Sequence, residues 1–292
     1  MRKYAFSFPI DLFLEPAWVD ALGNAKLKRI ELNLEDNDTA DTLDERIAKI
    51  VECQAAGKVI VGSVHIPFGS LWPLSDLDDD LRKAASIRIR DFIEACAPLN
   101  CKDFTLHGCL EPQPTEEPLL GKAIAQFRKT MDELIPVAEK FGVSLNIEDL
   151  PRTCLGKTAE ELARMIDGLP KEQVGICFDV NHFCGHPERL AAGIDLLADR
   201  IRTFHISDYD GDDECHWYPM LGAIDWAAVM TSIRRLPQDV LMVIEAFSFL
   251  VKPNWKKRPH HPEVFLRSHE RNVFVLENAA ELQKRISEMD IG

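Results

Sequence analysis

The sequence lacks the features that mark disordered, membrane-spanning and exported chains. Proline and glycine are sparse, at 17 and 15 of 292 residues, which excludes a chain that is disordered throughout. The longest apolar stretch, residues 240–251, carries Glu245 in its middle, so we expect no membrane-spanning segment. Residues 4–14 are broken by polar side chains and a proline, and no small-residue cleavage site follows them. We therefore expect a cytoplasmic protein without a membrane partner.

Positive charge is also scarce. Lysine and arginine number 34 against 48 aspartates and glutamates, which gives a formal net charge of −14. A protein that binds the phosphate backbone of nucleic acids usually presents a basic face. The charge balance therefore favours a small-molecule partner over a nucleic acid.

The cysteines do not form a recognisable framework. The eight cysteines include no C-x-x-C pair, which argues against a structural zinc knuckle. In a long chain without an export signal, irregularly spaced cysteines are more often free thiols than disulfides. We therefore expect reduced cysteines.

Strand-like and helix-like segments alternate along the whole chain. The expected strands are residues 3–8, 28–34, 59–66, 102–107, 143–148, 174–180, 201–207 and 240–246. The expected helices are residues 16–25, 42–56, 77–99, 119–141, 158–168, 187–199, 224–236 and 278–289.

This alternation predicts parallel strands joined by helical crossovers. Eight such units, with no proline-, glycine- or serine-rich linker between them, predict one domain over residues 1–292. The fold class is α/β, a single (β/α)8 TIM barrel. A doubly wound sheet is the alternative, but no G-x-G-x-x-G follows the first strand.

Ionisable side chains gather at the strand ends. If side chains alternate between the barrel interior and the helices, six successive strands end with an inward His, Asp or Glu. These residues are His65, His107, Glu148, Asp179, His205 and Glu245. Carboxylates that converge at low dielectric need a counter-charge, and mixed carboxylate and imidazole ligands suit Mn²⁺, Mg²⁺, Co²⁺ or Zn²⁺. We expect one of these metals and no organic cofactor.

Several short motifs occur in a characteristic order. They are VHIPF (64–68), LHG (106–108), IEDLPRT (147–153), FDVNH (178–182), HISDYDGDDECH (205–216), GAIDW (222–226) and IEAF (244–247). Together they resemble the xylose isomerase-like barrel superfamily. That superfamily contains sugar and sugar-phosphate isomerases and epimerases, inosose dehydratase and the family 2 apurinic/apyrimidinic endonucleases.

The resemblance implies roles for eight residues. In the epimerase branch it implies one metal held by Glu148, Asp179, His205 and Glu245. It also implies substrate contacts from His65, His107, His182 and His216. Gly211 and Cys154 stand where some epimerases have an arginine and a second glutamate, so the sugar or polyol is left open.

The metal and the two glutamates suggest a mechanism. A cation that chelates a carbonyl and its neighbouring hydroxyl acidifies the adjacent C–H and stabilises an enediolate. One glutamate removes the proton and the other returns it, with Glu148 and Glu245 in either order. We therefore expect an isomerase or epimerase that acts on a sugar, sugar phosphate or polyol.

Three alternatives remain. The endonuclease branch binds three metals, and His65, His107, His182 and the Glu214–His216 pair resemble its additional ligands. A dehydratase would use the same enediolate but expel a hydroxyl group. A barrel retained only for binding is disfavoured by the intact carboxylate and histidine set. The sequence also leaves a homo-oligomer open.

Other residues allow two interpretations. Glu31 also faces inward, and we interpret it as a salt-bridge partner at the barrel rim. Phe68, Trp72 and Trp217 lie on loops beside the expected site and either stack on a sugar or pack in the core. The basic residues 256–261 follow the last strand and form either a phosphate site or a solvated loop.

Overall fold

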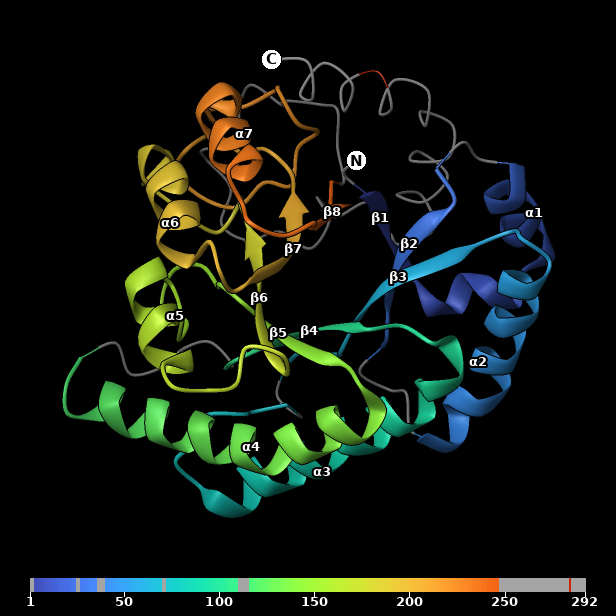
Figure 1. Ribbon diagram of the computed structural model, residues 1–292, viewed down its shortest axis with the longest axis horizontal. Coiled ribbons are helices and arrows are strands. Elements are labelled where there is room, and N and C mark those ends of the chain that lie inside the picture. Colours follow the sequence, from blue (N-terminus) through green and yellow to red (C-terminus); the bar gives the residue numbers. More distant parts are fainter. Residues whose placement is uncertain are drawn as a thin grey trace.

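The strands close into a parallel barrel surrounded by helices (Figure 1). The computed structural model describes residues 3–24, 27–35, 40–69, 72–109, 116–246 and 284. The strands are β1 (Lys3–Pro9), β2 (Arg29–Asn33), β3 (Ile60–His65), β4 (Asp103–His107), β5 (Ser144–Glu148), β6 (Val174–Asp179), β7 (Ile201–Ile206) and β8 (Leu241–Ile244). The helices are α1 (Pro16–Asn24), α2 (Ala40–Ala55), α3 (Asp79–Ala95), α4 (Leu119–Phe141), α5 (Ala159–Ile166), α6 (Leu190–Leu197) and α7 (Trp226–Arg234). Short 3-10 helices cover Ile10–Leu14, Ala97–Leu99 and Pro187–Arg189.

This architecture confirms the predicted (β/α)8 barrel. Each strand pairs with the next in sequence, and β8 closes the barrel on β1. The basic segment 256–261 and all of the predicted helix 278–289 except residue 284 lie outside the described residues, as does the last part of the predicted single domain. In the part of the chain that is described, no helix combines the length and the hydropathy needed to cross a bilayer. All eight cysteines are described, and none forms a disulfide, as expected.

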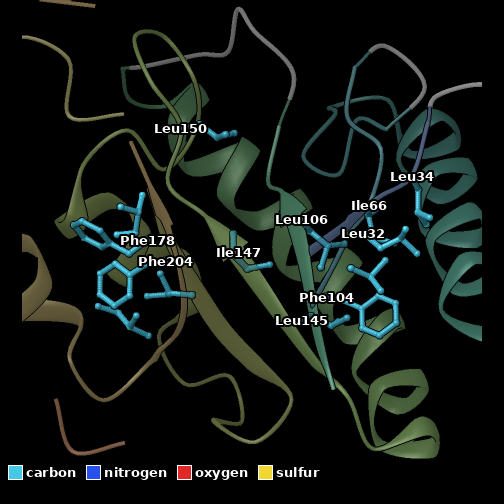
Figure 2. Close-up of a cluster of buried hydrophobic side chains, with 14 of the residues drawn as sticks. Leu32, Leu34, Ile66, Phe104, Leu106, Leu145, Ile147, Leu150, Phe178 and Phe204 are labelled. Carbon is cyan, nitrogen blue, oxygen red and sulfur yellow. The ribbon is translucent and has the colours of Figure 1, made fainter. Parts of the chain in front are cut away.

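The outer faces of the strands form the main hydrophobic core. Figure 2 shows side chains of this layer, including Phe104, Ile147, Phe178 and Phe204, packed between the strands and the helices. The rings of Phe178 and Phe204 lie 5.7 Å apart between centroids, and both side chains are fully buried. Because alternate residues of these strands are apolar and face outward, the intervening residues must face the interior.

Capping residues fix where helices begin after the strands that carry the site. Asp78 accepts hydrogen bonds from the backbone N–H groups of Asp80 and Leu81, so the acidic run serves as the start of α3. Thr158 accepts one from the N–H of Glu161 at 3.2 Å, and Asp225 accepts one from Ala228. These caps satisfy N–H groups that a helix leaves unpaired and so set where the loops after β3, β5 and β7 end.

The barrel interior holds both apolar and polar side chains. The buried side chains of Ala5, Leu241 and Val243 form a small separate cluster. Nearer the carboxyl ends of the strands, the interior holds the fully buried side chains of Glu31 and His205. The carboxyl mouth is therefore lined by ionisable groups.

Candidate active site

Four side chains converge at the carboxyl mouth of the barrel. The Nδ1 atom of His205 lies 2.9 Å from Oε1 of Glu148, 3.0 Å from Oε2 of Glu245 and 3.8 Å from Oδ2 of Asp179. One ligand atom from each of the four residues falls within 4.8 Å of the others. The structure thus brings together the four residues that the sequence suggested as metal ligands, although they are spread over nearly 100 positions of the chain.

The strand register explains this convergence. His107 on β4 is the register partner of Glu148 on β5, and Asp179 on β6 is the partner of His205 on β7. Glu245 directly follows β8, and its N–H donates to the carbonyl of Ile206 at 3.1 Å. Neighbouring strands therefore present their last inward residues at similar depths.

A second group shares Glu148. The other carboxylate oxygen of Glu148, Oε2, lies 3.2 Å from Nε2 of His65 and 3.0 Å from Nε2 of His107. The Nδ1 atom of His65 lies 2.8 Å from the carbonyl of Ile66, which orients the ring. His65, His107 and Glu148 could also hold a metal ion.

A third group joins the loops after β6 and β7. Nε2 of His182 lies 3.4 Å from Oε2 of Glu214 and 3.5 Å from Oδ2 of Asp179. His216 completes the group, and its Nδ1 lies 3.0 Å from the carbonyl of Glu245. All eight predicted site residues thus belong to one continuous arrangement of three groups.

The two candidate catalytic glutamates are held ionised. Burial disfavours the charge of Glu148, but the charge of His205 and the hydrogen bond from His107 hold its pKa well below its usual range. Burial also disfavours the charge of Glu245, but His205 outweighs burial and lowers the pKa of Glu245 to about 2. Both carboxylates can therefore accept a proton at neutral pH.

For Asp179, burial outweighs the neighbouring histidines, so its pKa is raised and not lowered. Burial raises its pKa to about 6, although His182 and His205 work against this rise. Its Oδ2 atom is buried and has no hydrogen-bond partner among the described residues. A buried carboxylate oxygen without a donor is costly, and a divalent cation would satisfy it. The orphaned oxygen and the mixed carboxylate and imidazole donors therefore fit a metal ion.

The histidines differ in charge. Burial lowers the pKa of His107, which favours a neutral ring. Burial also acts against the charge of His182 and His205, but neighbouring carboxylates raise the pKa of both well above the usual range. Without a metal ion, imidazolium groups supply the positive charge that the carboxylates require.

Two further carboxylates contribute to the site, and the sequence assigned neither of them a role in it. Glu31 pairs with His205 at 2.9 Å, as the salt-bridge interpretation predicted, but it is fully buried in the barrel interior and does not lie at the rim. Asp149 accepts a hydrogen bond from the N–H of Asp179 at 2.7 Å and so ties the end of β5 to β6. The alternation of side chains along β2 predicted that Glu31 faces inward, but nothing in the sequence indicated how far inside the barrel it lies. Asp149 comes directly after β5, where the alternation of the strand no longer applies.

The three aromatic residues that the sequence placed on loops beside the site lie in different environments. Phe68 is 55% exposed and stacks on the ring of His107, with centroids 4.4 Å apart. Trp72 is buried against Phe92 in the core, and Trp217 is also buried. Of the three, Phe68 therefore offers an open aromatic face beside the site.

One carboxylate organises the loop that carries Glu214 and His216. Oδ2 of Asp208 accepts a hydrogen bond from Nε1 of Trp226 at 2.8 Å, and Oδ1 accepts from the N–H groups of Tyr209 and Ile224. A Cβ atom on Gly222 would lie 2.3 Å from Oδ1 of Asp208, so the loop needs glycine there. These bonds fold residues 208–226 back over the strand ends.

Comparison with known proteins places this arrangement in a family. The model of the xylose isomerase-like TIM barrel family matches residues 19–267, which is most of the chain. The chain belongs to this family. Its family membership agrees with the resemblance that the sequence motifs indicated.

Curated relatives of the xylose isomerase-like barrel have different activities. Inosose isomerase of Bacillus velezensis is 24% identical over 166 residues, which are 54% of this chain and 58% of that protein. A probable endonuclease 4 of Methanoculleus marisnigri is 36% identical over 73 residues, which are 21% of this chain and 26% of that protein. The chain thus aligns with less than two thirds of the length of each of these relatives.

Solved structures share the fold over the whole length. D-psicose 3-epimerase in the presence of D-fructose has a TM-score of 0.72 and 15% identity, and the match covers 97% of this chain and 98% of that chain. The IOLI protein with a bound zinc atom has a TM-score of 0.67 and 18% identity, with 98% and 99% covered. At these identities the likeness establishes the barrel fold alone.

Proposed function

We propose that this protein is a divalent-metal-dependent isomerase or epimerase of a small sugar, sugar phosphate or polyol. The observation that carries the proposal is the meeting of Glu148 and Glu245 at one nitrogen of His205, at 2.9 and 3.0 Å. Two ionised carboxylates that flank one point suit a reaction in which one removes a proton and the other returns it. The sugar epimerases and isomerases among the structural and curated relatives support the same class.

Glu148, Asp179, His205 and Glu245 would hold the cation. The bound cation would act as a Lewis acid on the carbonyl and the neighbouring hydroxyl of the substrate. Glu148 and Glu245 would then exchange the proton of the adjacent carbon, in an order that the proposal leaves open. His65, His107, His182 and His216 surround these carboxylates and would contact substrate hydroxyls.

Proton exchange with solvent provides the test. Purified protein would be stripped of metal, reloaded with Mn²⁺, and incubated in D₂O with a panel of ketoses, their phosphates and polyol ketones. We expect deuterium to enter the carbon beside the carbonyl of at least one compound, and metal removal to abolish the exchange. Ketose substrates that remain unlabelled while losing water would instead indicate a dehydratase.

A second candidate is a multinuclear phosphodiesterase. Four overlapping groups of potential ligands share the site among the described residues, and Glu148 belongs to three of them. The local similarity to a probable endonuclease 4 agrees with this candidate. Clusters of metal ions suit phosphodiester cleavage because they stabilise both the attacking and the leaving oxygen.

Charge and metal content distinguish the two candidates. The net charge of −14 is unfavourable for a protein that follows a nucleic acid backbone. We expect elemental analysis to find one tightly bound divalent ion per chain. Three tightly bound zinc ions, together with cleavage of DNA at abasic sites, would favour the phosphodiesterase.

A further inference from the structure

We infer that Glu31 is a positioning residue that fixes the imidazole of His205 for metal binding. This inference rests on the proposed metal site and adds a residue outside the four proposed ligands. Its basis is the position of a fully buried carboxylate behind a fully buried histidine.

The contact between the two side chains is close. Oε1 of Glu31 lies 2.9 Å from Nε2 of His205, and both side chains are 0% exposed. The opposite ring nitrogen, Nδ1, faces Glu148 and Glu245. The ring of His205 therefore has a carboxylate on its inner side and the candidate metal position on its outer side.

Two hydroxyl groups hold Glu31 in this orientation. Ser63 Oγ donates a hydrogen bond to Oε2 of Glu31 at 2.8 Å, and Thr105 Oγ1 donates to the same atom at 3.2 Å. Both donors use Oε2, whereas Oε1 accepts no hydrogen bond among the described residues and has Nε2 of His205 as a close neighbour at 2.9 Å. Residues of β3 and β4 therefore fix the carboxylate of Glu31, which contacts His205 of β7.

This arrangement determines which nitrogen of His205 can bind a cation. The negative charge beside Nε2 favours the tautomer with its proton on that atom, which leaves the Nδ1 lone pair directed at the ligand group. Metal-bound histidines commonly have a carboxylate at their other nitrogen, and loss of that partner typically costs about 10–100-fold in metal affinity. A neutral, non-accepting side chain at position 31 would free the ring to rotate or change tautomer.

A purely structural role for Glu31 predicts a different result. In that case substitution would lower the free energy of unfolding, because His205 would lose a buried partner, but the folded protein would bind metal normally. Metal affinity and stability must therefore be measured separately.

The experiment uses calorimetric titration of the metal-free protein with Mn²⁺ at pH 7.5. The variants are Glu31→Gln, which keeps the shape, Glu31→Met, which removes the acceptor, and Thr105→Val, which removes one of the two donors. Phe204→Leu is the matched control, because it destabilises the same strand β7 from its outer face. We expect affinity to fall about 10–100-fold for Glu31→Met and by less for Glu31→Gln and Thr105→Val, while Phe204→Leu stays within about twofold.

Nitrogen NMR of histidine-labelled, Zn²⁺-loaded protein provides a second readout. We expect His205 of the unsubstituted protein to carry its proton on Nε2, and Glu31→Gln or Thr105→Val to weaken that preference if Glu31→Met fails to fold. Unchanged affinity and tautomer in every folded variant would overturn the inference while leaving the metal site intact. Absence of Mn²⁺ binding by the unsubstituted protein would overturn the proposed function and this inference with it.

Discussion

Glu148 places its Oε1 atom 2.9 Å from Nδ1 of His205 and its Oε2 atom 3.0 Å from Nε2 of His107. One carboxylate thus joins two groups of potential ligands. Because His205 is charged when no metal is bound, whereas a metal ligand must be neutral, metal binding and protonation should compete at this position.

The first prediction concerns proton release. Burial opposes the charge of His205, but Glu148, Glu31 and Glu245 raise its pKa well above the usual range, so the metal-free protein is protonated there at neutral pH. A raised pKa means that Mn²⁺ must displace the proton, and affinity should rise with pH by up to about tenfold per unit below that pKa. Calorimetry in buffers of different ionisation enthalpy should show protons released on binding; affinity that is independent of pH would contradict this.

The second prediction concerns catalysis. Glu245→Gln removes a proton acceptor but preserves the side-chain volume, so turnover should fall by about 10²–10⁴-fold. The melting temperature should change little, because one of several converging negative charges is removed. Glu188→Gln on the surface is the control and should keep full activity. Near-normal turnover of Glu245→Gln would reject the acid–base assignment.

The third prediction concerns the loop after β7. A Cβ atom on Gly222 would lie 2.1 Å from the carbonyl of Tyr209, which is backbone and cannot move freely. Gly222→Ala should therefore cost about 2 kcal/mol or more in free energy of unfolding, measured by urea denaturation. Gly23→Ala, whose added Cβ would meet only the flexible chain of Lys58, should change stability by less than about 1 kcal/mol. Equal effects of the two substitutions would refute this account of the loop.

The fourth prediction concerns the contact between α3 and α4. The side chain of Arg82 is 1% exposed and donates to Glu133 at 2.7 Å and to Thr130 at 3.1 Å. Arg82→Ala should cost about 2 kcal/mol, because charged hydrogen bonds and the packed stem are lost together. Arg90→Ala, at an exposed site beside Asp91, should change stability by less than about 0.5 kcal/mol under the same denaturation assay. A smaller loss for Arg82→Ala than for Arg90→Ala would show that the buried contact contributes nothing.

The fold was accessible from the sequence because its signals are local and repeated. Strands such as β4 and β6 carry outward apolar residues like Phe104 and Phe178, and that alternation also assigns the inward residues. The convergence of Glu148 and His205 then follows from parallel strands that end at one mouth.

The position of each inward side chain along the barrel axis could not be predicted from the sequence in the same way. The pairing of β2 with β3 shifts between Ile30 and Glu31, and the shift sets Glu31 opposite Ser63 inside the barrel. Such irregularities depend on packing between strands and leave no periodic trace. Likewise, the placement of Glu214 beside His182 depends on the hydrogen bonds of Asp208, which the alternation of strands and helices does not encode.

The most direct measurement is an anomalous difference map from crystals soaked in Mn²⁺. We expect a peak about 2.0–2.3 Å from His205 Nδ1 and from carboxylate oxygens of Glu148, Asp179 and Glu245. Crystals that bind Mn²⁺ only elsewhere, or not at all, with these four side chains still joined by direct ion pairs, would contradict this expectation.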